Sequence, residues 1–178
     1  MDLDRWLSGP LIRTRHRREG LAGVQELWVS AGAVRLDECR ILGPLIRARI
    51  PGLNPCLTFS ELFHSDPFNV LEAGPMYTLS GLCGRIWTVR GDFAQLDHPT
   101  EFLTWQVPRT VRVLFANWAE QAGEGAALVS EVRIAAVDRR AALYVRALAP
   151  FISAFQGLIA TEPLRLAVQR AAPDGQGE

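Results

Sequence analysis

Glu61 and His64 come nearest to catalytic chemistry in the types and spacing of their side chains. They lie three residues apart in a segment, residues 57–64, that we expect to form a short helix, so their side chains can touch. Histidine titrates near neutral pH, and a carboxylate beside it could act as a general acid or base at a pocket mouth. A pair of this kind is more often a surface contact near a helix end, and we favour that interpretation.

Glu131 and Arg133 form the second candidate pair. They lie two residues apart in a strand expected over residues 126–137, so they share one face, and Val132 points to the other. One interpretation turns the charged pair away from the core, into cross-strand ion pairs. The other turns it inward, with Glu131 as a third candidate catalytic residue and Arg133 as an anchor for a ligand carboxylate or carbonyl. Burying an incompletely partnered pair costs several kcal/mol, which favours the first interpretation.

Other reactive groups are sparse. Cys39, Cys56 and Cys83 are far apart and odd in number, without a CxxC spacing, so we expect no disulfide framework, no metal site and no cofactor. Asp97 and His98 are too few ligands to hold a metal. The chain has no Gly-x-Ser-x-Gly elbow and no glycine-rich phosphate loop.

The length and net charge of the chain favour a single-domain protein and argue against several other classes of protein. The 178 residues suit one domain, residues 1–178, and the formal net charge of zero argues against nucleic-acid binding. Every basic residue is arginine, which indicates GC-rich coding and excludes Schiff-base chemistry on lysine. Apolar runs fall short of the ~20 residues of a membrane span. The acidic first residues are unlike a signal peptide, and with free cysteines they favour a cytoplasmic location.

Hydrophobic periodicity predicts a mixed α+β chain. Residues 1–18 should form an N-terminal arm that includes the basic run 13–18. Helices are expected over residues 36–50, where Pro44 should kink or split the helix, and over residues 57–64. Residues 101–107 fit either a strand or a helix. Strands are expected over residues 24–30, 68–73, 76–90 with a bend at Gly84, 110–120 and 126–137.

The last third of the chain predicts one long helix over residues 138–171, with Asp138 as its N-cap. Pro150, Gly157 and Pro163 should bend or break it, and residues 172–178 should form a frayed tail. The apolar stripe of this helix requires a covering sheet. Its members are Tyr144, Leu148, Phe151, Ile152, Phe155, Leu158, Ile159 and Leu166.

Three short motifs occur in a familiar order. A middle strand carries Gly81-Leu82-Cys83-Gly84-Arg85-Ile86-Trp87, and the last strand carries Ser130-Glu131-Val132-Arg133-Ile134. In the terminal helix Tyr144 precedes Pro150 by six residues, and an apolar stretch follows. In these features residues 20–171 resemble the START-like, polyketide cyclase/dehydrase or Bet v 1-like superfamily, and uncharacterised bacterial members in particular. Ser130 and Val132 replace two threonines of the usual pattern.

The resemblance implies a helix-grip fold, in which a curved antiparallel sheet of about six or seven strands wraps around the C-terminal helix. It also implies an apolar cavity between them. We therefore expect binding of a small hydrophobic molecule, such as a lipid, isoprenoid or polyketide-like compound, without catalysis. A cyclase- or hydrolase-like enzyme and a regulatory protein with a closed cavity are the alternatives, and a homodimer is left open. The expected ligand contacts are Arg85, Trp87, Trp105, Phe115, Asn117, Arg133, Tyr144, Leu148, Phe151 and Phe155.

Overall fold

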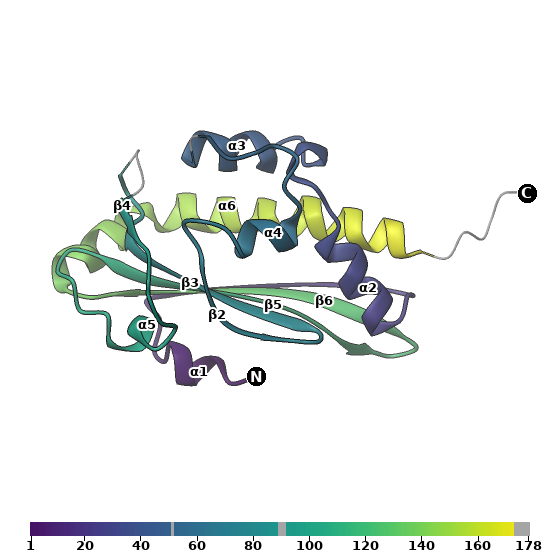
Figure 1. The fold of residues 1–178 in the computed structure, drawn as a ribbon, viewed down its shortest axis with the longest axis horizontal. Coiled ribbons are helices and arrows are strands. Elements are labelled where there is room, and N and C mark those ends of the chain that lie inside the picture. The colour runs from purple at the N-terminus through teal and green to yellow at the C-terminus, as the bar shows by residue number, and fades with distance from the viewer. Residues whose placement is uncertain (51, 89–91, 173–178) are drawn as a thin grey trace, which may run out of the picture.

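The computed structural model describes residues 1–50, 52–88 and 92–172, without the side chains of residues 49, 155, 156 and 158–160. Within these ranges, an antiparallel sheet of six strands carries the long helix α6 along one face (Figure 1). The strands are β1 (Ile12–Gly20), β2 (Asn69–Gly74), β3 (Tyr77–Arg85), β4 (Asp92–Ala94), β5 (Val111–Ala122) and β6 (Gly125–Ala136). The helices are α1 (Leu3–Trp6), α2 (Val24–Gly32), the 3-10 helix η1 (Leu36–Glu38), α3 (Leu42–Arg49), α4 (Phe59–Phe63), α5 (Glu101–Thr104) and α6 (Arg139–Ala171).

The sheet has the order β1-β6-β5-β3-β2, and β4 pairs with β3 beyond the end of β2. Its longest pairing is the β5–β6 hairpin, which turns through two residues, Gly123 and Glu124. Gly123 has a φ of +57°, which a tight two-residue turn requires and which glycine adopts without strain. The turn sets the register of the two strands, so that Asn117 lies directly opposite Ser130.

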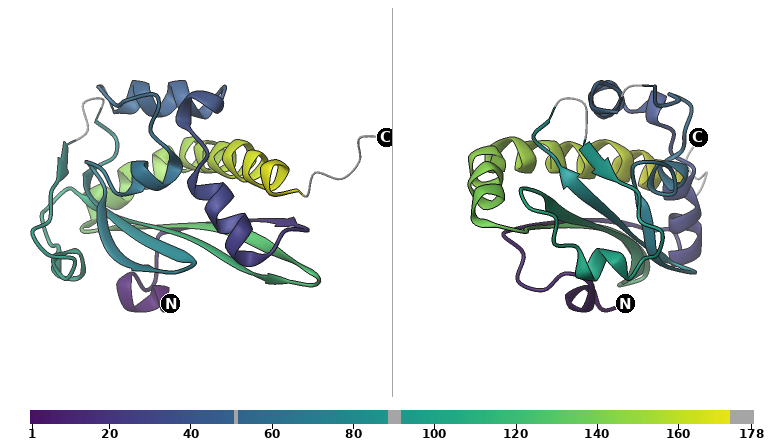
Figure 2. Two further views of the ribbon diagram at one scale, coloured as in Figure 1. Left: turned by 45° about the vertical axis from the view of Figure 1, so that its right-hand side comes forward. Right: turned by 60° about the vertical axis from the view of Figure 1, so that its left-hand side comes forward.

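Both faces of the sheet are covered. On the inner face, Val132 and Ile134 pack against residues of α6. On the outer face, Leu114 and Ala116 pack with residues of α1 and α5. Figures 1 and 2 show α3, α4 and α6 on one side of the sheet and α1 and α5 on the other. The expected helix-grip arrangement of a curved sheet around the C-terminal helix is therefore confirmed.

Helix α6 begins where the sequence predicts. The Asp138 carboxylate accepts a hydrogen bond of 2.8 Å from the backbone N–H of Ala141, as an N-cap should. The helix continues through Pro150 and Pro163 to Ala171, so of the two predicted outcomes, a bend or a break, the break does not occur. The right-hand view of Figure 2 shows the first turns at an angle to the rest, which is the bend expected of a proline inside a helix.

The strand predicted over residues 24–30 is wrong, because this segment forms helix α2. Val24, Leu27, Trp28 and Ala31 recur at helical spacing and pack into one core cluster with residues of α6 and β6. The preference of valine and tryptophan for strands is weaker than the gain from burying this apolar face.

Two further expectations need correction, and one open choice is decided. The helix predicted over residues 36–50 is split between η1 and α3, but the break precedes Pro44, which sits in the first turn of α3 where no intrahelical donor is lost. The N-terminal arm is shorter than residues 1–18, because β1 begins at Ile12 and pairs with β6. The segment 101–107, for which the sequence allows a strand or a helix, contains the short helix α5; Trp105 follows as its C-cap, and its Nε1 donates to the Thr110 hydroxyl over 2.8 Å.

Candidate functional site

Two adjoining cavities lie between the inner face of the sheet and the helices above it. The first, which we call the apolar chamber, has a volume of about 400 Å³. Ile46, Leu82, Val113, Ile134, Leu148 and Ile152 are among its walls. The second, the polar chamber, also has a volume of about 400 Å³. Trp28, His64, Thr78, Asn117, Ser130 and Pro163 are among its walls. Each volume lies within the usual range for small-molecule sites, about 300–1,000 Å³.

Phenylalanine rings of α4 separate the two chambers. Phe59 and Phe63 line both cavities, and their ring centroids lie 5.8 Å apart. Phe63 also contacts Phe115 of β5 and Phe68, at centroid distances of 5.6 and 5.2 Å. Phe59 and Phe63, at the two ends of the five-residue helix α4, therefore lie at the boundary between the two chambers.

Four of the expected ligand contacts lie along these cavities. Phe115, Leu148 and Phe151 line the apolar chamber, and Asn117 lines the polar chamber. Phe151 is 74% exposed at the mouth of the apolar chamber, so it does not fill the cavity as the closed-cavity alternative requires. The side chain of Phe155 lies outside the described residues. The role of these side chains as ligand contacts stays a prediction.

Arg133 and Glu131 lie on the outer face, away from both chambers. The Arg133 Nε donates to Glu131 over 2.6 Å, and its Nη1 donates to Asp4 over 2.5 Å and to the carbonyl of Leu7 over 3.0 Å. Arg13 of β1 completes the network, 2.9 Å from the Glu131 carboxylate. The placement of Arg133 as a ligand anchor is therefore wrong, and the interpretation with cross-strand ion pairs holds.

Glu131 is also unsuited to acid–base catalysis near neutral pH. Burial raises the pKa of this carboxyl, but hydrogen bonds from Arg13 and Arg133 outweigh burial and hold the pKa below its usual value. The carboxylate therefore stays ionised, and both its oxygens are occupied.

Four other expected contacts lie outside the described chamber walls. Arg85 is half-exposed and pairs with Asp92 over 3.2 Å. The rings of Trp87 and Tyr144 stack on each other, with centroids 5.0 Å apart. Tyr144 is 52% exposed, so the expectation that it fixes a ligand inside the cavity is wrong. Trp105 belongs to the outer-face cluster beneath α1 and α5 and cannot reach the cavity.

Glu61 and His64 do not form the expected pair. Glu61 instead closes a capping box, in which its carboxylate accepts hydrogen bonds from the backbone N–H and the hydroxyl of Thr58. These bonds lower the pKa of Glu61. The His64 Nδ1 donates to the carbonyl of Ser60 over 2.7 Å, and the ring lies beside the polar chamber.

Trp28, Thr78 and Ser130 are among the wall residues that were not predicted from the sequence. Ser130 was identifiable, because a two-residue turn at Gly123 and Glu124 places it opposite Asn117. Trp28 was not predicted to line the cavity, because its segment was assigned to a strand and forms helix α2. The position of Thr78 depends on the pairing of β3 with β5, which are joined by a long connection that carries no register signal.

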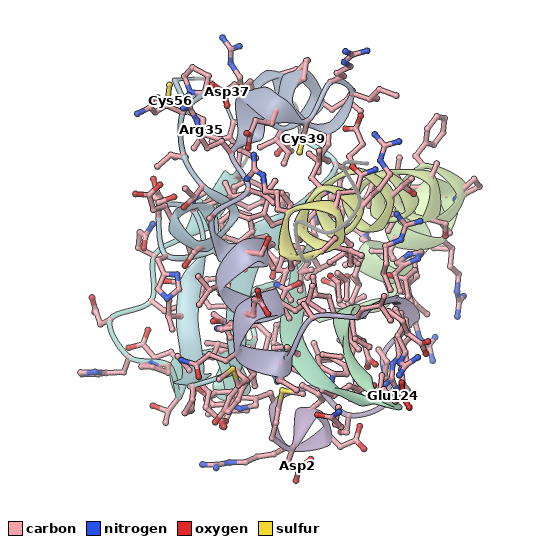
Figure 3. All side chains as sticks on the ribbon, turned by 90° about the vertical axis from the view of Figure 1, so that its right-hand side faces the viewer. Asp2, Arg35, Asp37, Cys39, Cys56 and Glu124 are labelled. Atoms are coloured by element: carbon pink, nitrogen blue, oxygen red, sulfur yellow. The ribbon has the colours of Figure 1, made fainter. Side chains whose placement is uncertain are left out.

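The cysteines divide into one exposed and two buried thiols. Burial raises the pKa of Cys39 and of Cys83 to about 12, so neither is a nucleophile at neutral pH. Figure 3 shows Cys56 at the surface beside Arg35 and Asp37, whereas Cys39 lies beneath α3.

We predict that iodoacetamide adds a single label to the folded chain, at Cys56. Intact mass and peptide mapping measure this directly. Labelling in urea should modify all three thiols. Rapid labelling of Cys39 or Cys83 without urea would contradict the packing of their clusters.

Within the described ranges, no group of three or more His, Cys, Asp or Glu side chains could hold a metal ion. None of the helices in that part of the chain combines the length and the hydropathy that crossing a membrane requires.

Comparison with known proteins gives low similarity throughout. No protein-family model and no curated protein sequence matches this chain. Two solved structures are similar to it at 9% sequence identity. TTHA0849 from Thermus thermophilus aligns over 90% of this chain and 96% of its own, with a TM-score of 0.34. Ara h 8.0201 aligns over 84% of this chain and 99% of its own, with a TM-score of 0.24.

Proposed function

We propose that this protein binds a small hydrophobic molecule, such as a lipid, isoprenoid or polyketide-like compound, between the sheet and α6. The observation that carries the proposal is the apolar chamber, a cavity of about 400 Å³ with walls of aliphatic and aromatic side chains. Burying a ligand there releases water from apolar surface on both partners, which stabilises the complex by about 25 cal/mol per Å². The mouth lies between α3 and α6, where Leu45 and Phe151 are exposed.

Binding without chemical conversion fits the groups around the two chambers. Glu131 lies on the outer face, and Glu61 is held by Thr58, so neither carboxylate meets a bound molecule. A cyclase- or hydrolase-like reaction has little support from the remaining candidate, His64, which is not paired with an acidic side chain among the described residues. The cytoplasmic location and a homodimer stay predictions.

The proposal is tested with the neutral fluorescent probe N-phenylnaphthylamine, whose emission rises in apolar surroundings. The unmodified protein should bind it saturably. The double variant Leu148→Trp/Ile152→Trp adds bulk from α6 into the apolar chamber and should weaken binding at least about tenfold, which corresponds to about 1.4 kcal/mol.

Leu143→Trp is the matched control, because Leu143 lies on the same helix but is 64% exposed. It should bind the probe as the unmodified protein does, and circular dichroism should show that all variants are folded. Absence of saturable binding to the unmodified protein, or full affinity in the double variant, would overturn the proposal.

A further inference from the structure

Four adjacent strands place one hydrogen-bonding side chain each along a single line across the inner face. Thr78 of β3 is opposite Asn117 of β5, Asn117 is opposite Ser130 of β6, and Ser130 is opposite His16 of β1. Directly opposed residues of antiparallel strands point to the same face, with Cβ atoms about 4.5–5.5 Å apart. We call this line, Thr78-Asn117-Ser130-His16, the polar row.

The polar row faces the cavity. Thr78, Asn117 and Ser130 line the polar chamber, and Ser130 is only 6% exposed. His16 continues the row beneath α6, where its Nε2 is fully buried. His16 falls within the basic run 13–18, but strand alternation turns His16 inward while Arg15 and Arg17 turn outward.

The polar groups of the row lack partners within the protein. Among the described residues, the Nε2 of His16 and the Oγ1 of Thr14, two residues earlier on the same face of β1, are buried without a hydrogen bond. The side chains of Thr78, Asn117 and Ser130 have none either within that part of the chain. Ser80 lies two residues after Thr78 on the same face of β3. Its hydroxyl does have a partner within the protein, because it donates to the carbonyl of Phe63 over 3.0 Å. Buried polar groups are normally paired, since each unpaired group costs about 1–3 kcal/mol. The buried Ser130 hydroxyl and the half-buried Thr78 and Asn117 side chains in the chamber wall therefore offer unpaired groups whose hydrogen bonds a ligand can complete.

The charge of the polar chamber restricts the ligand. His64 is the one ionisable side chain among its described walls. Three of the four arginines of β1 have partners on the outer face: Arg13 with Glu131, Arg17 with Glu120, and Arg15 over the ring of Trp118 at 5.2 Å. The fourth, Arg18, lies on the inner face opposite Leu128, but it is not among the described walls of the polar chamber. A carboxylate or phosphate in the polar chamber would lose its hydration without meeting an arginine among the described walls, which is unfavourable. A hydroxyl or carbonyl oxygen can pair with an amide and hydroxyl groups at little cost.

We propose, on the basis of the binding function above, that the ligand is an amphipathic molecule with an uncharged oxygen group at one end. Its hydroxyl or carbonyl binds the polar row, and its hydrocarbon part extends past Phe63 into the apolar chamber. The Phe59 and Phe63 rings, which line both chambers, then pack against the middle of the ligand.

Competition against bound N-phenylnaphthylamine tests this inference, with decanol and decanoate as the competing probes. Decanol should displace the dye at a concentration at least about tenfold lower than decanoate at neutral pH. The variant Asn117→Leu/Ser130→Ala keeps the cavity volume near its original value but removes two partners. It should bind decanol about tenfold more weakly and bind the dye unchanged.

Ser80→Ala is the control, because it removes an inner-face hydroxyl that already has a protein partner. Its affinity for decanol should stay within about twofold of the original. If the dye binds but decanoate competes as well as decanol, or if the double variant keeps its affinity for decanol, the inference is wrong and the binding function stands. If the unmodified protein does not bind the dye, both proposals fail.

Discussion

Replacing Glu131 by alanine is expected to destabilise the protein by about 3–5 kcal/mol, because it leaves the buried Arg133 guanidinium without its anionic partner. Arg133 is 4% exposed. Its other acidic contact is Asp4, whose side chain is mostly exposed to solvent and belongs to the short N-terminal helix α1. The loss should also release α1 from the outer face, since Arg133 binds both Asp4 and the carbonyl of Leu7. Urea denaturation followed by circular dichroism measures the free energy of unfolding.

Asp92→Ala is the matched control, because its ion pair with Arg85 is exposed to solvent. An exposed pair contributes about 0.2–1 kcal/mol, so this variant should unfold near the original urea midpoint. Equal losses in the two variants would show that the outer-face network is worth no more than a surface contact.

The contribution of Glu131 should depend on pH. Its pKa is lower in the folded chain than in the unfolded chain, so the stabilisation is present above the unfolded pKa of about 4.3 and is lost as the pH falls through the folded pKa. The difference in stability between the original protein and Glu131→Gln should therefore shrink on acidification below about pH 4. A difference that stays constant over that range would contradict the ion-pair explanation.

Gly84→Ala is expected to cost at least about 2 kcal/mol and to disturb the apolar chamber. Gly84 has a φ of +150°, and a Cβ at this position would lie 2.0 Å from the backbone oxygen of Asp92. Strands β3 and β4 would have to separate, and β4 carries Phe93, one wall of the chamber. Both the urea midpoint and the affinity for N-phenylnaphthylamine should fall.

Gly157→Ala serves as the comparison for this glycine. It lies inside α6 with no atom within 4 Å of the added Cβ, so alanine should stabilise the helix by about 0.5–1 kcal/mol. If Gly84→Ala were as stable as the original protein, β4 would not be held in the position described.

The most accurate sequence predictions concern features that depend on near neighbours in the chain. The long helix α6 and its Asp138 cap follow from periodicity and from a single side chain, and both are present. The predicted stripe is only partly right, because Tyr144 and Phe151 are exposed. The buried residues of α6 in the described part of the chain include Ala141, Val145, Ala167 and Ala171. The β5–β6 hairpin follows from a glycine turn between two apolar strands. The prediction for residues 24–30 was wrong because it depended on distant contacts. The apolar residues of this segment suit both a strand and a helix, and only packing against α6 decides between them.

The residues of the candidate site also separate into those that could be predicted from near neighbours in the chain and those that depend on tertiary contacts. That Phe115 and Asn117 share a face, and that Leu148 and Phe151 share the stripe of one helix, could be read from the sequence. The face to which Arg133 points could not, because alternation within a strand is equally consistent with either side. The pairing of β1 with β6, more than a hundred residues away, decides it by bringing Arg13 to Glu131 and α1 over Arg133.

The sequence by itself therefore determined the α+β class, the long gripped helix and its cap, since these arise from local spacing. Tertiary structure alone decided that the charged pair lies on the outer face and that His16 joins Ser130, Asn117 and Thr78 in one row. The physical reason is that hydrogen-bond register between distant strands brings together side chains whose proximity leaves no periodic trace in the chain.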